Sequence, residues 1–345
     1  MKTKATDLVF FYPDGHQAHY QIGHPERPER VELLRQAFDE AGWWQIYPTL
    51  KPEAVPAEVL QSIHTPAYLN ILQEACKIGA SLDMDTYTTP ASWQLALNAA
   101  GGAIAIASAV WQGKARRGFA LTRPPGHHAT ADQGMGFCLL NNIAIATEYL
   151  IQKEGVHRLA IVDLDLHHGN GTQEIFWRRG DVLYISTHQS PHYPGTGDLE
   201  ETGAGPGGGA TANFPLPAGS GDQAFIEIMD GFIVPLLTRF NPEIILVSFG
   251  FDTHWRDPLG SLLLSAAVYG KIIASLVRYA DENINGRIAL ILEGGYDLDA
   301  GKACGQAVVA ALLGEPWDDP IGPAPQMESR YWMIMARRAR EIWNL

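Results

Sequence analysis

Short apolar runs alternate with longer amphipathic stretches along almost the whole chain. The apolar runs have the length and composition of buried strands, and they span 8–12, 119–122, 158–164, 182–187, 244–249 and 288–292. Hydrophobic residues at helical spacing predict helices over 28–41, 91–112, 139–153, 222–239 and 261–281. Strands and helices in alternation are typical of a parallel sheet with helices on both faces, so the pattern predicts an α/β fold.

The chain shows no repeat of solenoid period and no low-complexity linker, so we expect one domain over residues 1–317. The remaining segment, 318–345, is Pro-rich at first and then mixes aromatic and basic residues. Its end, 330–345, is predicted to be a helix that packs on the body or on a second subunit. The glycine cluster at 203–209 lacks the flanking strand, helix and Lys-Ser/Thr pair of a phosphate loop, which predicts a surface loop.

The most informative segment follows the third predicted strand, where Asp163, Asp165 and His167 alternate with leucines. Side chains alternate between the two faces of an extended segment, so these three project to one side. Carboxylates and an imidazole without thiolates suit zinc or a similar divalent ion with a position open for water. Burying three ionisable groups is costly unless something binds or pairs them. Taken alone, the segment could still be a strand end with hydrogen-bonded caps.

Three other predicted strands also end in polar groups. The first is followed by His127 and His128 in a Pro/Gly turn, and imidazoles that titrate near neutrality can take and return a proton. The other two are followed by Asp252 and by Tyr296, which lies on a glycine turn. Each feature alone could be a cap or a turn. Because parallel strands end at one edge, where open α/β folds bind ligands, the combination predicts an active site.

Together, these motifs resemble those of the zinc-dependent histone deacetylase family, in its class II-like branch. The motifs are RPPGHHA at 123–129, DLDLHHGNGTQ at 163–173, FDxHxxDPLG at 251–260 and EGGY at 293–296. The resemblance covers roughly residues 10–315, and the branch rests on Asn170 and the segment 251–260. It implies the three-layer arginase/deacetylase fold, with a mostly parallel central sheet and helices on both faces. It also implies the activity of a histone deacetylase-like amidohydrolase.

The resemblance implies that Asp165, His167 and Asp252 bind one zinc ion per chain, while Asp163 and Asn170 orient the histidine pair. Zinc would polarise the amide carbonyl and activate a water molecule. The sequence leaves open whether the native metal is zinc or iron.

By the same resemblance, one of His127 and His128 would be the general base and then the acid, with the other as an electrostatic partner. The sequence does not fix which does which. Tyr296 would donate its hydroxyl to the developing oxyanion.

Further residues are implied by the family's other sites. A structural potassium ion would be bound by Asp163, Asp165, His167, Ser186 and Thr187, and a second cation would lie near Phe176, Arg179 and Val182. The substrate channel would be lined by Gly136, Phe137, Tyr193 and Leu259. The internal acetate pocket would contain Arg30, for which nearby Arg27 is an alternative. Polyamine-selective relatives carry a glutamate where this chain has Leu259. The leucine of this chain has no charge to hold a distant ammonium group, so Leu259 predicts a preference for acyl-lysine peptides.

Net charge and cysteine content limit the classes of partner and the compartment expected for this protein. A net charge of −13 over 345 residues argues against nucleic-acid binding and is compatible with cationic substrates, either an acyl-lysine protein or peptide or an acetylated small amine. The three cysteines, Cys76, Cys138 and Cys304, are far apart and odd in number, which argues against a disulfide framework and favours a reducing compartment. We expect no signal peptide, no membrane span and a cytoplasmic protein. The sequence leaves homo-oligomer formation open.

Three alternatives to a lysine deacylase make different demands on the sequence. A binuclear manganese hydrolase of the arginase type would need more carboxylates than the segment 252–254 provides. A catalytically inactive acyl-lysine binding protein would be expected to have lost Tyr296 or one histidine of the pair, and all are present. An acetylpolyamine amidohydrolase stays open as the second candidate. The sequence leaves the physiological substrate and the preferred acyl chain unassigned.

Overall fold

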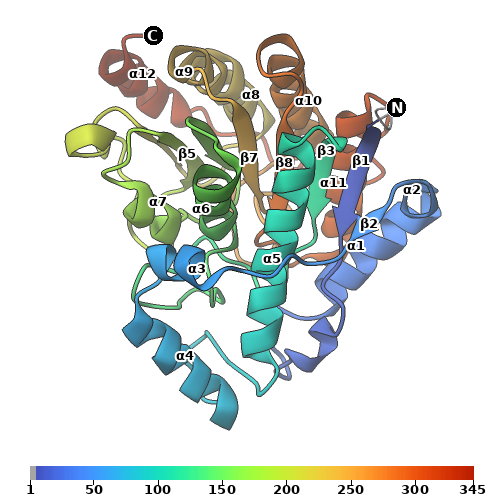
Figure 1. The fold of residues 1–345 in the computed structure, drawn as a ribbon. Coiled ribbons are helices and arrows are strands. Elements are labelled where there is room, and N and C mark those ends of the chain that lie inside the picture. Colours follow the sequence, from blue (N-terminus) through green and yellow to red (C-terminus); the bar gives the residue numbers. More distant parts are fainter. Residues whose placement is uncertain (1–4) are drawn as a thin grey trace.

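Eight strands form one sheet in the computed structural model, which describes residues 5–345 (Figure 1). The strands are β1 (Thr6–Phe11), β2 (Thr49–Leu50), β3 (Ala115–Ala120), β4 (Leu159–Asp163), β5 (Val182–Gln189), β6 (Thr211–Leu216), β7 (Ile244–Phe249) and β8 (Ile288–Leu292). Their order is β2-β1-β3-β8-β7-β4-β5-β6, and every pair is parallel. The carboxyl ends of all eight strands therefore face one edge, as the α/β prediction required.

Twelve α-helices surround the sheet within the described residues. They are α1 (Glu29–Glu40), α2 (Trp43–Ile46), α3 (Ala57–Ile63), α4 (Pro66–Ile78), α5 (Ser92–Trp111), α6 (Asn142–Glu154), α7 (Asn170–Phe176), α8 (Asp222–Ile228), α9 (Val234–Phe240), α10 (Ala266–Asn283), α11 (Leu298–Leu313) and α12 (Trp332–Trp343). A π-helical turn, Met229–Ile233, joins α8 to α9. A helix predicted to begin at residue 261 begins instead at Ala266, because the Ser265 side chain caps it by accepting the Val268 amide.

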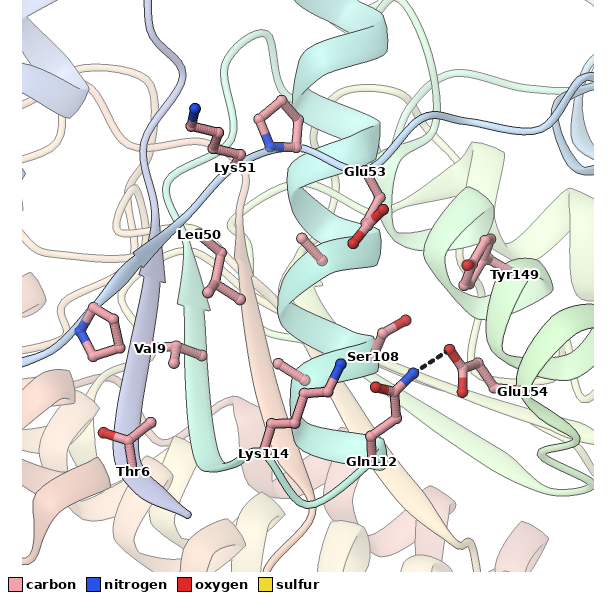
Figure 2. A pocket seen from close by; sticks show the side chains of 14 residues that line it. Thr6, Val9, Leu50, Lys51, Glu53, Ser108, Gln112, Lys114, Tyr149 and Glu154 are labelled. Atoms are coloured by element: carbon pink, nitrogen blue, oxygen red, sulfur yellow. Dashed lines mark hydrogen bonds between the residues drawn. The ribbon is translucent and has the colours of Figure 1, made fainter. Parts of the chain in front are cut away.

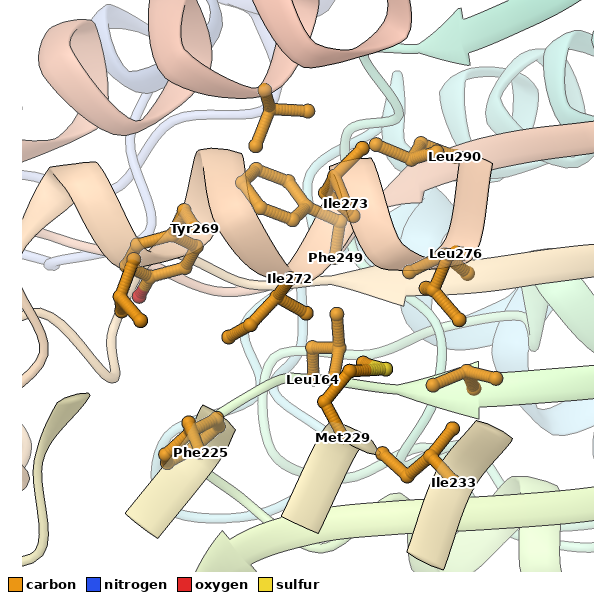
Figure 3. Close-up of a cluster of buried hydrophobic side chains, with 14 of the residues drawn as sticks. Leu164, Phe225, Met229, Ile233, Phe249, Tyr269, Ile272, Ile273, Leu276 and Leu290 are labelled. Atoms are coloured by element: carbon orange, nitrogen blue, oxygen red, sulfur yellow. The ribbon is translucent and has the colours of Figure 1, made fainter. Parts of the chain in front are cut away.

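Hydrophobic side chains pack on both faces of the sheet. One cluster joins the sheet to α1, α8, α10, α11 and α12, and the other joins it to α3, α4, α5 and α6. Figure 3 shows part of the first cluster, where α10 and the α8–α9 segment lie over side chains of the sheet. The labelled residues are Leu164, Phe225, Met229, Ile233, Phe249, Tyr269, Ile272, Ile273, Leu276 and Leu290. Because both faces are covered, the strands contain long apolar runs rather than alternating polar residues.

Helix α5 is the central helix of one face (Figure 1). By length and composition alone it could cross a membrane, which the sequence pattern did not predict. In this fold 78% of its most apolar window is buried inside the molecule, as expected of a core helix.

The C-terminal segment contacts the body. Helix α12 packs against β6 and α8, and the side chains of Trp332 and Trp343 are buried. The carboxylate of Glu328 accepts the backbone amides of Gln223 and Ala224, both at 2.9 Å, at the start of α8. Carboxylates are favourable at helix N-termini, so this contact fixes the segment to the helix.

Candidate metal centre and active site

Three side chains from neighbouring strand ends meet at the carboxyl edge of the sheet. Asp165 and His167 follow β4, and Asp252 follows β7, the strand beside it. One ligand atom from each lies within 4.8 Å of the other two, and all three residues are buried. His167 Nδ1 is 3.2 Å from Asp165 Oδ1 and 3.3 Å from Asp252 Oδ2.

Backbone amides fix the orientation of the two carboxylates. Asp165 Oδ2 accepts from the Gly294 amide at 2.8 Å, and Asp252 Oδ1 accepts from the Leu166 amide at 3.0 Å. Asp252 Oδ2 has no hydrogen-bond donor among residues 5–345, although it is buried. A buried acceptor without a donor is costly, so this oxygen fits a cation bound at the centre.

Charge supports the same conclusion. Burial alone would lower the pKa of His167, but the neighbouring carboxylates of Asp165 and Asp252 outweigh burial and raise the pKa to about 9. Burial and the neighbouring Asp165 raise the pKa of Asp252. Two carboxylates in a buried site therefore require a positive charge, which either a proton or a metal ion supplies.

Glycines enclose these carboxylates. A Cβ atom added to any of three glycines would overlap a carboxylate oxygen, and the pairs are Gly169 with Asp163, Gly250 with Asp165 and Gly294 with Asp252. The three glycines follow β4, β7 and β8. The chain backbone itself, rather than side chains, therefore forms the wall behind the acidic groups.

The two histidines predicted for proton transfer lie together, with ring centroids 4.1 Å apart. They have different partners. His127 Nδ1 is 3.0 Å from Asp163 Oδ2, whereas His128 Nδ1 is 2.8 Å from the amide oxygen Asn170 Oδ1. One ring is therefore paired with a carboxylate and the other with a neutral amide.

These partners separate the charge states of the two rings. Burial would lower the pKa of His127, but Asp163 and Asp165 outweigh it and raise the pKa to about 10. Burial, together with the positive charges of His127 and His167, holds the pKa of His128 well below its usual value. Two titratable neighbours with opposite shifts are typical of acid and base roles.

Tyr296 lies in the turn after β8, and its side chain is buried. Its ring lies 4.9 Å from the Arg30 guanidinium carbon and packs edge-on against Phe137 at 5.7 Å. Arg30 donates to the carbonyl oxygens of Gly295 and Glu293, each at 2.5 Å. The turn that carries the tyrosine is thus fixed to α1.

The predicted channel residues lie beside the histidines and Tyr296. The Tyr193 ring packs edge-on against His128 at 5.1 Å. A Cβ added to Gly136 would lie 2.5 Å from the His128 ring and 3.0 Å from Tyr193, so only glycine fits between them. Leu259 is half-buried, and its carbonyl oxygen bonds to His192 Nε2 at 2.8 Å.

The sequence of this chain is similar to those of known proteins. Residues 24–312 match the Histone deacetylase domain. The chain belongs to the histone deacetylase family.

Relatives of this family member come from archaea, bacteria and plants. A probable deacetylase of Archaeoglobus fulgidus is 42% identical over 294 residues, which is 84% of this chain and 82% of the relative. The histone deacetylase-like amidohydrolase of Pseudomonas aeruginosa is 38% identical over 85% of this chain and 77% of its own length. Histone deacetylase 14, chloroplastic, of Arabidopsis thaliana is 37% identical over 86% of this chain and 74% of its own length.

The fold agrees with a solved structure of the family. The crystal structure of the HDA15 HD domain superimposes with a TM-score of 0.89 at 31% identity, covering 99% of this chain and 95% of that chain. The arginase/deacetylase fold predicted from the motifs is therefore confirmed, with the difference that the central sheet is entirely rather than mostly parallel.

Of the residues predicted for monovalent cations, Ser186 and Thr187 lie beside Asp163, whereas Val182 lies at the amino end of β5, where it pairs with Leu159. Ser186 and Thr187 are on β5, where Ser186 pairs in register with Asp163. The Thr187 hydroxyl donates to the Asp163 carbonyl at 3.4 Å, and Tyr184 donates to its carboxylate at 3.1 Å. The residues of the second predicted site, Phe176, Arg179 and Val182, lie between the end of α7 and the start of β5.

Of the two arginines considered for the acetate pocket, Arg30 lies behind the tyrosine turn and Arg27 is only half-buried. Sequence reasoning missed the acid between the arginines of this region. Glu26 is fully buried and contacts both Arg30, at 3.2 Å, and Arg123, at 2.7 Å. Its place in the HPERPER segment gave the only sequence signal, because Arg30 follows Glu26 at the i,i+4 spacing that allows an acid and an arginine to pair.

Glu293 is a second acid that the sequence did not single out, although it begins the EGGY motif. Its carboxylate accepts the amides of Gly126, at 2.7 Å, and His127, at 3.1 Å, and the Ser248 hydroxyl at 2.9 Å. His127, Cys138 and Glu293 also form a group of possible metal ligands, because one ligand atom of each lies within 4.8 Å of the other two. Because both oxygens of Glu293 already have donors, this carboxylate is satisfied and supports the histidine turn.

A large hollow lies away from the strand ends that carry these residues. A cavity of about 550 Å³ is located between β1, β2 and α5, toward the amino ends of the strands (Figure 2). Its lining includes Val9, Leu50, Ser108 and Lys114. A smaller hollow of about 270 Å³ is lined by Arg27, Pro258 and Tyr296. Cavity size therefore does not locate the candidate active site, whereas buried charge does.

Proposed function

We propose that this chain is a zinc-dependent amidohydrolase that removes acetyl or other acyl groups from lysine side chains. The observation that carries the proposal is the meeting of a buried Asp-His-Asp set, a histidine pair with opposite pKa shifts and a buried tyrosine at one edge of the sheet. Membership of a family of deacetylases and amidohydrolases supports the reaction class.

The donor set fits a divalent ion. Asp165, His167 and Asp252 would hold it, and the unsatisfied oxygen Asp252 Oδ2 is the atom that most needs it. When bound, zinc would polarise the scissile carbonyl and make water a nucleophile at neutral pH. We also propose that potassium binds beside β5 through Asp163, Ser186 and Thr187.

The different hydrogen-bond partners of the two histidines favour different roles for them in the reaction. The amide oxygen of Asn170 holds the Nδ1–H of His128, which leaves His128 Nε2 free to take a proton from the attacking water and return it to the leaving amine. The carboxylate of Asp163 favours the charged form of His127, which would stabilise negative charge at the reacting carbon. The Tyr296 hydroxyl would donate to the carbonyl oxygen as it becomes an oxyanion.

The channel favours a polypeptide substrate. Leu259 offers apolar contact and no counter-charge for a distant ammonium group, which suits an acyl-lysine within a peptide. We propose acylated peptides or small amines that carry further positive charges as the partners, because the net charge of −13 is compatible with cationic substrates and disfavours nucleic acid. A cytoplasmic location, which would supply such substrates, is part of this proposal.

Acetylated polyamines are a second candidate substrate class. Burial and the carboxylates of Asp85 and Asp83 raise the pKa of Tyr193, so two acids lie near this wall of the channel. A nearby negative charge favours a substrate that carries a second ammonium group.

The deciding experiment measures acetate release from an acetyl-lysine peptide and from acetylspermidine by one preparation, with and without chelator. We expect release from both to stop with chelator and the peptide to be preferred. Binding of the peptide without acetate release would instead indicate a non-catalytic acyl-lysine binding protein. Chelator-resistant release would contradict the metal mechanism.

A further inference from the structure

The carboxylate of Asp257 connects two loops of the active site. Its Oδ2 accepts the backbone amides of Tyr296, at 2.6 Å, and Asp297, at 3.2 Å. Its Oδ1 accepts the amide of Leu259 at 3.0 Å. The side chain is buried in the loop after β7, and none of these bonds involves the Asp-His-Asp set. One carboxylate therefore binds the tyrosine turn and the channel rim at the same time.

The position of the Tyr296 hydroxyl depends on such contacts. Within residues 5–345 the hydroxyl makes no hydrogen bond of its own, so the backbone of the turn and the packing of the ring determine where it lies. Arg30 holds the turn from one side through two carbonyl oxygens. Asp257 holds it from the other side through two amides.

We infer that Asp257 is a positioning residue that sets the place of Tyr296 and joins it to Leu259 at the channel rim. The inference rests on the proposed function, in which the tyrosine hydroxyl serves the oxyanion. Transition-state contacts require accurate placement, and a displacement of about 1 Å can cost about 100-fold in rate. The three backbone amides occupy both carboxylate oxygens of Asp257. An asparagine would direct its NH₂ group, which cannot accept a hydrogen bond, toward at least one of these amides.

The test compares Asp257→Asn with the wild type and with a matched control. Asp319 likewise accepts three backbone amides, from Ala267, Ile321 and Gly322 at 2.8 to 3.0 Å, but it ties the C-terminal segment to α10. We expect Asp257→Asn to lower kcat about 10- to 100-fold with KM within about twofold, as for loss of a transition-state contact. Asp319→Asn should leave both parameters near those of the wild type.

A double-mutant cycle separates positioning from general destabilisation. If Asp257 acts through the tyrosine hydroxyl, adding Asp257→Asn to Tyr296→Phe should cost less than about threefold more in kcat, because the group it positions is already absent. Full additivity of the two losses would overturn the inference. If Asp257→Asn does not fold cooperatively, Asp257→Ser undergoes the same measurements.

A second measurement does not depend on turnover. Amide hydrogen exchange in residues 293–297 should be faster in Asp257→Asn than in the wild type and unchanged in Asp319→Asn. Unchanged exchange in Asp257→Asn would refute the positioning role. A wild type that releases no acetate from either substrate would refute the proposed function, and the exchange result would still decide whether Asp257 holds the turn.

Discussion

Glu26 and Arg123 pair through both carboxylate oxygens in the interior of the protein. The Arg123 Nε to Glu26 Oε1 distance is 2.7 Å and the Nη2 to Oε2 distance is 3.0 Å, and both side chains are fully buried. Arg123 begins the segment that carries the histidine pair, and Glu26 also contacts Arg30 behind the tyrosine turn. One acid thus joins the two halves of the candidate active site.

This pairing predicts a pH-dependent contribution to stability. Burial would raise the pKa of Glu26, but Arg123 and Arg30 outweigh it and lower the pKa to about 2. A folded-state pKa below the unfolded one stabilises the protein at neutral pH, and the stabilisation fades as the pH falls from about 4.5 toward 2. Glu26→Gln should therefore lose on the order of 3 kcal/mol of unfolding free energy at pH 7, and less as the pH falls.

Urea unfolding at pH 7, 5 and 3 measures this difference. The control is Glu58→Gln, since Glu58 pairs with Lys153 at the surface and should change stability little at any pH. An equal gap between wild type and Glu26→Gln at pH 7 and pH 3 would show that the pair does not behave as described.

The Asp-His-Asp set predicts one divalent metal ion per chain. Chelation should abolish turnover and lower the Tm of the wild type, because a ligand that binds only the folded state stabilises it. Asp252→Asn should bind little metal, so chelator should leave its Tm unchanged. Elemental analysis gives the count, and Asp299→Ala, at an exposed ion pair, is the control. Two divalent metal ions per chain, or full activity in Asp252→Ala, would contradict the assignment.

Tyr296→Phe removes one hydroxyl and keeps the ring. Loss of an oxyanion donor should lower kcat by about 100-fold or more. The Tm should hardly change, since the hydroxyl has no hydrogen-bond partner among the described residues. Tyr149→Phe, at the remote cavity of Figure 2, is the matched control and should retain activity. Near-normal turnover of Tyr296→Phe on an acetyl-lysine peptide would mean that another group serves the oxyanion.

Leu259→Glu should shift selectivity toward acetylpolyamines. A carboxylate at the half-buried rim could pair with the distant ammonium group, and such a pair is worth about 1 kcal/mol, or about fivefold in the ratio of kcat/KM values. Leu259→Gln has the same length as the glutamate variant without its charge and should leave the ratio near that of the wild type. If the wild type prefers acetylspermidine, or if glutamate and glutamine act alike, the rim does not select by charge.

Much of the fold could be predicted because buried parallel strands are continuous apolar runs, as in β7 and β8. The sequence did not reveal β2, which has two residues, or β6, an edge strand that contains Pro215. Strand β3 begins four residues earlier than predicted. The apolar pattern missed its first residues because Arg117 interrupts it. This arginine is buried and pairs with Asp281, so its charge hid a strand position.

The candidate site could be predicted where its residues follow strands in recognisable motifs. Asp163 and Asn170, which hold the histidine pair, were predicted, but the buried acids Glu26 and Asp257 were not. Glu26 and Arg123 are 97 positions apart, and Asp257 and Tyr296 are 39 apart. Their partners are backbone amides or distant arginines, and neither periodicity nor local spacing encodes which buried acid will meet them.

The glycines behind the acidic groups limit how this protein can change. At Gly169, Gly250 and Gly294 even a methyl group would occupy the volume of a carboxylate oxygen, although none of the three performs chemistry. Saturation mutagenesis at these three positions should therefore yield almost no functional variants, and alanine should be excluded as well. The positions that tolerate no substitution would thus identify the site of the buried carboxylates as clearly as the acidic residues themselves do.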